Sequence, residues 1–214
     1  MPLYSIGQNL CGYNAGFDDN SFNAWSGDTG DNITDPLTGF PILTTTWIGI
    51  DTSKGFWGSN QMIMRIPVND PNTCNTVPEI CPWGSPYSAR LGNSVPFCHN
   101  EGLYYRMTVN PAQPILVYAF APVLQDPNHP DYAQPAFTCY VKSSLGTTIP
   151  CTYYRATATN LRGTSSCPDP FQGIQNVYRN WRNVAIDLSA YAGQQVTVVY
   201  KTNDCNWCGH WGYA

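Results

Sequence analysis

The chain has 214 residues, 43% of them hydrophobic, which suffices for one large β-sandwich or at most two small domains with a buried core. Only 11% of the residues are charged and the net charge is −4, with three lysines, seven arginines and no basic run. A nucleic-acid partner is therefore disfavoured, because binding phosphate requires clustered lysine and arginine. No stretch approaches about 18 consecutive apolar residues, so no membrane-spanning segment is expected.

The first residues carry neither the basic nor the apolar region of a signal peptide. If the protein is secreted, we expect that its signal sequence has been cleaved or is not included in this numbering. We expect residues 1–8 to be a short lead-in and residues 9–214 to form a single β-sandwich domain, because no low-complexity linker or clear repeat divides the chain.

Two acidic clusters follow the lead-in. One contains Asp18 and Asp19, and the other contains Asp28 and Asp31. Calcium binds about six to eight oxygen ligands from carboxylates, amides and carbonyls. The four aspartates are therefore candidate ligands of one structural calcium ion. Solvated turns rich in Asp, Asn and Gly explain the same pattern equally well.

Short strands dominate the rest of the chain. Glycine and proline, 18 each, interrupt it every few residues, and the runs between them are rich in β-branched and aromatic residues. A single helical turn is expected at 187–191, before Gly193. This pattern predicts an all-β fold, a two-sheet antiparallel β-sandwich of jelly-roll type with long disulfide-stapled loops. The clearest expected strands are residues 42–50, 61–68, 103–109, 115–124, 136–143, 152–159, 181–188 and 195–202.

Three long loops lie between these strands, at residues 69–86, 126–135 and 160–180. Long loops on a rigid sandwich are where binding residues usually lie. The alternative is that they are connections held by disulfides. Both remain open for the first and third loops, which contain cysteines.

Nine cysteines in a chain of this size indicate an oxidising compartment and several disulfides. Because nine is odd, at least one thiol is free or pairs with another chain. Cys98 is expected in a disulfide and not in a thiol–imidazole pair with His99, since neighbours in a strand point to opposite faces.

Sequence alone does not fix the disulfide connectivity. Cys74 and Cys81 could close a small loop, and Cys139 and Cys151 could form a disulfide across a hairpin. Cys205 and Cys208 could pair within the C-x-x-C turn at 205–208, or Cys205 could pair with Cys151 instead.

Aromatic residues make up 14% of the chain, including seven tryptophans. Exposed tryptophan and tyrosine rings are flat apolar platforms for sugars. Trp57, Trp83 and Trp207 lie in turn-like sequence and are the candidate ligand-binding aromatics, although a loop tryptophan can also simply fill its own loop. The tryptophans expected in the core are Trp25, Trp47, Trp181 and Trp211.

Four segments carry a resemblance to a known family: SARLGN at 88–93, YAFAPVLQDPNH at 118–129, VAIDLSAYAGQ at 184–194, and DC with GHWGYA at 204–214. Together they are similar to a jelly-roll domain of large secreted Bacteroidota surface proteins. Such proteins often carry PKD repeats and gliding-motility or type IX secretion tails. The first and third segments also occur in MAM-like and carbohydrate-binding modules.

The chain departs from this family at two places. The family pattern continues past Gly-Tyr-Ala with an aromatic, an aliphatic and an aspartate, whereas this sequence stops at Ala214, so the last strand looks truncated and the calcium site loses one expected ligand. Asn206, Trp207 and Cys208 also stand where the family has small residues.

The more specific family segments contain the polar residues Asp126, His129 and His210. A shared site from two loops at one end of the sandwich could bind a ligand or a metal. The alternative is a hydrogen-bonded anchor in which His129 ties its loop to the turn at 209–210.

The resemblance implies a non-catalytic domain at the bacterial cell surface, and we therefore expect binding or adhesion to a glycan or protein on another surface. A structural subunit of a surface filament, with copies of itself or neighbouring domains as partners, is the second hypothesis. A carbohydrate-binding module attached to a secreted hydrolase is another. Enzymatic activity is not expected, because no catalytic motif is present and a hydrolase would depend on Glu79 and Glu101, the only two glutamates.

Overall fold

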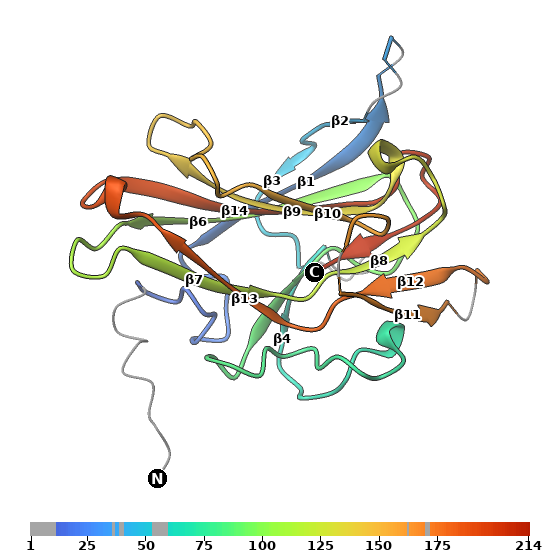
Figure 1. Ribbon diagram of the computed structural model, residues 1–214, viewed down its shortest axis with the longest axis horizontal. Helices are drawn as coiled ribbons and strands as arrows, with labels where there is room; N and C mark the ends of the chain where they lie inside the picture. Colours follow the sequence, from blue (N-terminus) through green and yellow to red (C-terminus); the bar gives the residue numbers. More distant parts are fainter. Residues whose placement is uncertain (1–11, 36, 39–40, 53–59, 162, 170–171) are drawn as a thin grey trace.

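A computed structural model describes residues 12–35, 37–38, 41–52, 60–161, 163–169 and 172–214 (Figure 1). This part of the chain folds into antiparallel β-strands and short 3-10 turns, with no α-helix. The expected all-β sandwich is therefore confirmed. None of the described helical turns has the length and apolar character that crossing a bilayer requires.

One layer is a seven-stranded sheet in the order β10-β9-β14-β6-β1-β2, with β3 paired to β1. Strands β6, β9 and β14 form its centre, and β14 pairs with β6 along nine residues and with β9 along eight. The strands are β1 (Trp25–Thr34), β2 (Pro41–Leu43), β3 (Trp47–Ile48), β6 (His99–Thr108), β9 (Ala136–Ser143), β10 (Tyr154–Thr157) and β14 (Gln195–Asn203).

The second layer consists of smaller sheets below the first in Figure 1. One has the order β11-β12-β8-β15, and two pairs, β13-β7 and β4-β5, accompany it. The strands are β4 (Gln61–Met64), β5 (Ser88–Leu91), β7 (Ile115–Phe120), β8 (Val123–Asp126), β11 (Ser165–Pro168), β12 (Gln175–Tyr178), β13 (Arg182–Asp187) and β15 (Gly212–Tyr213).

The expected strand at 115–124 is divided into β7 and β8 at Ala121 and Pro122. Proline has no backbone N–H and cannot donate to a ladder, which explains the break. The carbonyl of Pro122 still accepts a hydrogen bond from the amide of Arg179 at 3.2 Å, so the two halves continue against β12 and β13.

The core fills the space between the layers. Alternate residues of β6, β9 and β14 point inward, and Val141, Val196 and Val198 are at most 3% exposed. A second part of the core surrounds Trp211 and Tyr213, whose rings stack 5.3 Å apart. Of the tryptophans expected in the core, Trp47 is 60% exposed on the edge strand β3, so that expectation is wrong.

Two predicted irregular regions contain strands. The segment with Asp28 and Asp31 is β1, a central part of the large sheet, and the loop at 160–180 contains β11 and β12. Glycines at 27 and 30 lower the apparent strand propensity of β1, yet the Cβ that Gly30 lacks would overlap the backbone of Thr44, so close packing against the adjacent segment favours glycine there. The predicted helical turn is confirmed as η4 (Ser189–Tyr191).

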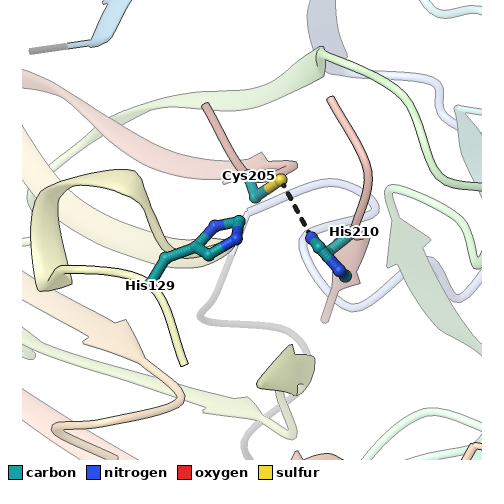
Figure 2. A group of neighbouring side chains, drawn as sticks. All are labelled: His129, Cys205 and His210. Atoms are coloured by element: carbon teal, nitrogen blue, oxygen red, sulfur yellow. Dashed lines mark hydrogen bonds between the residues drawn. The ribbon is translucent and has the colours of Figure 1, made fainter. Parts of the chain in front are cut away.

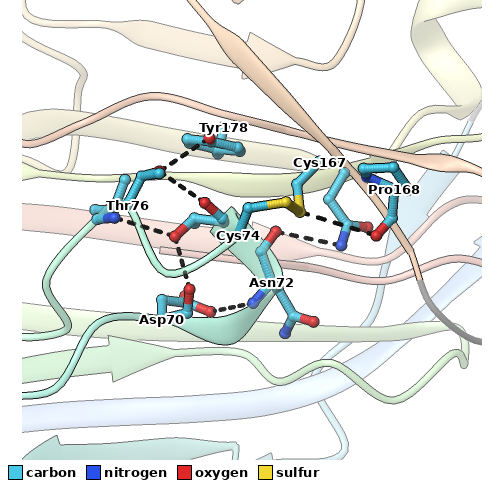
Figure 3. Close-up of a disulfide and its surroundings, with 10 residues drawn as sticks. Asp70, Asn72, Cys74, Thr76, Cys167, Pro168 and Tyr178 are labelled. Carbon is cyan, nitrogen blue, oxygen red and sulfur yellow. Dashed lines mark hydrogen bonds between the residues drawn. A yellow bond between two sulfur atoms is a disulfide. The ribbon is translucent and has the colours of Figure 1, made fainter.

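Two disulfides join distant loops. Cys74 pairs with Cys167 across 93 residues and connects the loop after η2 (Pro71–Thr73) to β11 (Figure 3). The hydroxyl of Thr76 donates to the hydroxyl of Tyr178 at 2.9 Å beside it. The second disulfide, Cys98–Cys208, links the start of β6 to the turn before β15 and confirms the expectation for Cys98. Disulfides persist in oxidising compartments, which agrees with an extracellular chain.

The predicted pairings are wrong, because Cys81, Cys139, Cys151 and Cys205 are free thiols in the structure. Cys139 lies in β9 opposite Tyr154 and points into the core, whereas Cys151 lies in the exposed turn before β10 begins. The register therefore separates them. Cys208 is taken by Cys98 and Cys74 by Cys167, which leaves Cys205 and Cys81 unpaired. Cys11 lies outside the described residues.

Candidate functional site

Three side chains from two loops lie close together (Figure 2). His129 lies between β8 and η3 (Asp131–Ala133), and Cys205 and His210 lie in the loop between β14 and β15. Their ligand atoms all lie within 4.8 Å of one another, and Sγ of Cys205 is 3.3 Å from Nδ1 of His210. We call these three residues the loop cluster.

The loop that carries His129 is held by its neighbours. Asp126 accepts hydrogen bonds from the backbone N–H of Asn128 at 3.0 Å and from the side chain of Gln134 at 3.1 Å. Gln134 is fully buried and also donates to the carbonyl of His129 at 3.0 Å. Asp126 therefore helps to position the loop that carries His129. Its role in ligand binding stays a prediction.

The loop that carries Cys205 and His210 is held equally firmly. The amide of Cys205 donates to the carbonyl of His210 at 2.9 Å, so both residues come from one closed turn. The amide of Asn206 donates to the carbonyl of Ala133 at 3.1 Å and joins this turn to the His129 loop. The Cys98–Cys208 disulfide fixes the tip of the turn.

The loop cluster is partly exposed and chemically distinct. Cys205 is fully buried, whereas both imidazoles are half-buried. Burial lowers the pKa of His129 and of His210, so both rings favour the neutral form that binds metals. The ring of Trp207 is 55% exposed, and its centroid lies 4.0 Å from that of His129. Two imidazoles and one thiol are a donor set for a transition metal.

A second site lies on the outer face of the seven-stranded sheet. A groove of about 340 Å³ runs across β1, β6, β14 and β9, under the turn that follows β9, drawn yellow to orange above the sheet in Figure 1. We call it the sheet groove. It is lined by Ser26, Tyr104, Arg106, Lys142, Ser143, Ser144, Gly146, Gln195, Thr197 and Val199.

Strand register builds the sheet groove. Arg106, Thr197 and Lys142 lie opposite one another on β6, β14 and β9, and Tyr104 lies one row along with its neighbours Val199 and Tyr140. Side chains at alternate positions share a face, so these residues all point away from the core. The result is a polar surface flanked by two tyrosine rings.

One end of the sheet groove contains a buried polar network. The hydroxyl of Tyr104 donates to Asp28 at 2.7 Å, and Nζ of Lys201 lies 3.9 Å from the same carboxylate. Burial, with the bond to Asp28, raises the pKa of Tyr104 and keeps its hydroxyl protonated. A Cβ on Gly102 would overlap the side chains of both Asp28 and Tyr104, so one or both would have to move if the glycine were replaced.

Two basic side chains, Arg106 and Lys142, line the rest of the sheet groove together with neutral polar residues. Within the described residues, neither Arg106 nor Lys142 forms an ion pair, and Nζ of Lys142 lies 5.7 Å from the ring centroid of Tyr140. Two of the chain's three lysines therefore lie on this face of a molecule whose net charge is −4. The groove is a local positive region.

The two glutamates do not form an exposed catalytic pair. Glu101 is 2% exposed, faces the core and accepts a hydrogen bond from Thr202 at 2.7 Å. Burial raises its pKa to about 8 and also raises the pKa of Asp204 well above its usual range. Glu79 is half-buried in the loop at 69–86. A solvent-filled site between two carboxylates is needed for glycoside hydrolysis, and Glu101 does not reach solvent.

The remaining predicted residues are dispersed. Trp83 is 52% exposed in its loop, and Trp57 lies outside the described residues. Asp18 and Asp19 lie in turns before β1, and Asp19 accepts hydrogen bonds from Tyr13, Ser21 and Asn23.

Asp28 and Asp31 lie three residues apart in β1 and so point to opposite faces. In the described part of the chain, the group of His, Cys, Asp and Glu that could hold a metal is the loop cluster and contains none of these aspartates. Calcium binding stays a prediction.

The sequence did not reveal Cys205 as a member of the loop cluster, nor the sheet groove. Cys205 was expected in a disulfide. It stays a free thiol because Cys208, its neighbour in the C-x-x-C turn, pairs with Cys98, which is 110 residues away from Cys208 in sequence. The alternation of Tyr104 and Arg106 in β6, and of Tyr140 and Lys142 in β9, was the available signal for the groove.

Comparisons with known proteins give little beyond this geometry. No family model matches the chain, and no curated protein matches it. The structure of TmCBM61 in complex with beta-1,4-galactotriose aligns with a TM-score of 0.41 and 10% identity, over 94% of this chain and 90% of that one. The enzymatically active domain of bacteriophage CBA120 tailspike protein 4 aligns with a TM-score of 0.40 and 8% identity, over 94% of this chain and 20% of that one.

Proposed function

We propose that this chain is a non-catalytic extracellular domain that binds carbohydrate in the sheet groove, with a preference for acidic glycans. The observation that carries the proposal is the open polar groove of about 340 Å³, in which two basic side chains that form no ion pair with the described residues lie beside tyrosine rings. Its size suits a short stretch of a glycan chain.

The chemistry of the lining matches a hydroxylated, acidic ligand. Ser143, Gln195 and Thr197 offer neutral donors and acceptors for sugar hydroxyls. Tyr104 and Tyr140 offer apolar ring faces against which the C–H faces of a pyranose pack. Arg106 and Lys142 supply positive charge for a carboxylate or sulfate group, and the fork of arginine can bind a carboxylate through two bonds.

The two disulfides and the resemblance to jelly rolls of Bacteroidota surface proteins support a place at the bacterial cell surface. Such a domain adheres to a glycan on another surface or holds a secreted enzyme on its substrate. The fixed strand register of the groove suits binding, because regular strands hold side chains in place before the ligand arrives.

The experiment is a titration of the purified, disulfide-bonded chain with acidic and neutral oligosaccharides, followed by calorimetry. Arg106→Ala and Lys142→Ala are each expected to weaken binding of the acidic glycan about 10- to 100-fold, because a hydrogen bond to a charged group contributes about 1.5–3 kcal/mol. Arg182→Ala, on exposed β13 of the other layer, is the matched control and should leave binding unchanged.

Absence of binding to every acidic and neutral glycan tested would contradict the proposal. Equal loss in Arg182→Ala and Arg106→Ala would place the binding surface elsewhere. Binding of neutral glycans alone, unaffected by Arg106→Ala, would remove the acidic preference.

A further inference from the structure

We propose that the loop cluster binds one zinc ion, with Cys205, His129 and His210 as its protein ligands. The three ligand atoms come from two loops that are fixed in the structure by hydrogen bonds and by the Cys98–Cys208 disulfide. The three side chains point toward a common centre in Figure 2.

The spacing of the ligand atoms is close to what zinc needs. Zinc–sulfur bonds of about 2.3 Å and zinc–nitrogen bonds of about 2.0–2.1 Å in a tetrahedron place the ligand atoms roughly 3.3–3.8 Å apart. Sγ of Cys205 and Nδ1 of His210 are 3.3 Å apart, and all three ligand atoms lie within 4.8 Å of one another. Small rotations of side chains therefore complete the geometry without moving the backbone.

The donor set selects the metal. Thiolate and imidazole bind zinc and copper, whereas calcium and magnesium require oxygen ligands. Binding replaces the Cys205–His210 contact with two bonds to the metal, and the thiol proton is released to solvent. Because the protein offers three ligands and both imidazoles are half-exposed, the fourth position remains open to water or to an external ligand.

Two further observations separate this cluster from an ordinary hydrogen-bonded turn. Among the residues that the structure describes, Nδ1 of His129 is buried without a hydrogen-bond partner, which is costly unless something binds there. The amide of Gly209 lies 3.3 Å from Sγ of Cys205, an N–H···S contact that stabilises a thiolate. The cluster thus contains a buried nitrogen without a hydrogen-bond partner in the described part of the chain and a sulfur that accepts an N–H hydrogen bond.

The site is separate from the sheet groove. Strand β14 starts at Gln195, which lines the groove, and ends at Asn203, two residues before Cys205. Nine residues of strand span roughly 25–30 Å, and the groove uses the first half of β14, up to Val199, whereas the loop cluster follows its other end. Failure of glycan binding therefore does not bear on the metal proposal.

The test uses the metal-free, disulfide-bonded chain and titrates it with Co²⁺ and then Zn²⁺. We expect one equivalent of Co²⁺ to produce a thiolate-to-cobalt charge-transfer band and visible bands of a tetrahedral site, and Zn²⁺ to displace it. Cys205→Ser should abolish the charge-transfer band. His129→Gln and His210→Gln should each weaken binding at least about 100-fold, because even outer residues of metal sites contribute 10- to 100-fold.

Cys151→Ser and His99→Gln are the matched controls, since one is an exposed free thiol and the other a histidine outside the cluster. Both should retain the cobalt spectrum. Should Cys205→Ser fail to fold, the zinc-dependent rise in Tm of the wild type, absent in His210→Gln, tests the same point, because ligand binding to the native state raises its stability.

Three outcomes overturn the proposal: no cobalt band in the wild type, a band that survives Cys205→Ser, and binding that His129→Gln and His210→Gln leave unchanged. Tight binding of Cu²⁺ with no response to zinc or cobalt would overturn the assignment to zinc. Any of these results would favour the alternative that the three residues only anchor the two loops to each other.

Discussion

The sheet groove uses the first half of β14 and the loop cluster follows its other end, and the two are built by different means. The groove is assembled from alternate residues of neighbouring strands, so backbone pairing alone places its side chains. The loop cluster joins two loops that are 76 residues apart between His129 and Cys205 and depends on a disulfide and a few hydrogen bonds. Ligand binding in the strand-built sheet groove should therefore survive substitutions that loosen the loops, whereas metal binding in the loop cluster should not.

The largest effect is expected when the disulfide beside the loop cluster is removed. Cys98→Ser combined with Cys208→Ser should lower the free energy of unfolding by about 2–5 kcal/mol, since native disulfides restrict the unfolded chain. Cobalt binding should be lost as the turn at 205–210 loosens, while glycan binding in the groove persists. Urea unfolding, cobalt absorption and calorimetry on one preparation measure all three.

The control for that variant is Cys151→Ser, which removes an exposed thiol and should change stability by no more than about 0.5 kcal/mol. If glycan affinity and cobalt affinity fell together in the double variant, the two sites would depend on one cooperative unit. The contrast between strand-built and loop-built sites would then be wrong.

The next largest effect targets the groove alone. Gly102→Ala places a methyl group against the carboxylate of Asp28 and the hydroxyl of Tyr104, so one or both must move. We expect a cost of about 1–3 kcal/mol from overpacking, weaker glycan binding and an unchanged cobalt spectrum. Unfolding in urea and glycan calorimetry report the two losses.

Gly209→Ala is the companion substitution at the loop cluster. A Cβ there meets no heavy atom within 4 Å, so stability and glycan binding should remain those of the wild type. Equal stability of the two alanine variants would mean that the crowding at Gly102 is relieved without cost.

The fold could be predicted from the sequence more completely than either candidate site. Alternating apolar residues in 195–202 and 136–143 predicted the central strands, because one face of each is buried. The sequence pattern does not show which strands are adjacent. In the structure β6, β14 and β9 are neighbours, and this pairing brings Arg106, Thr197 and Lys142 together in the groove. Pairing between strands is a tertiary property that no local pattern contains.

The loop cluster was half predicted for a related reason. His129 and His210 were placed together as a potential metal or ligand site, which the structure brings together at a ring-centroid distance of 5.0 Å. Cys205 was assigned to disulfides because C-x-x-C suggests local pairing. The actual partner of Cys208 is Cys98, which directly precedes β6. Only the tertiary structure reveals that Cys205 remains a free thiol.

A smaller effect should appear in the pH dependence of stability. The folded state holds the pKa of Glu101 near 8, above its ordinary value of 4.5, because the carboxyl is buried. The folded chain therefore retains this proton where the unfolded chain loses it. Stability is full below about pH 4.5 and falls as the pH rises toward 8, by up to about 1.4 kcal/mol per pH unit for one group.

Glu101→Gln removes that dependence, so its unfolding free energy should fall less between pH 5.5 and 8 than that of the wild type. Asp204 has a raised pKa of its own, so part of the slope should remain. Glu79→Gln, a glutamate in a half-buried loop, should alter the slope less. Urea titrations at several pH values measure the slopes, and identical slopes for wild type and Glu101→Gln would mean that Glu101 ionises freely in the folded chain.

The smallest effect distinguishes a ligand from a neighbour at the loop cluster. Trp207 packs against His129, with the two rings tilted and their centroids 4.0 Å apart, but it offers no metal-binding atom. Trp207→Ala should weaken cobalt binding no more than about 10-fold and leave stability within about 0.5 kcal/mol, because the ring is 55% exposed. Trp207→Phe, which keeps a ring over the imidazole, should restore most of the affinity. If Trp207→Ala lost as much cobalt affinity as His129→Gln, packing of the indole ring would be what holds His129 in place. The loop cluster would then depend on side-chain packing even more than its contrast with the sheet groove implies.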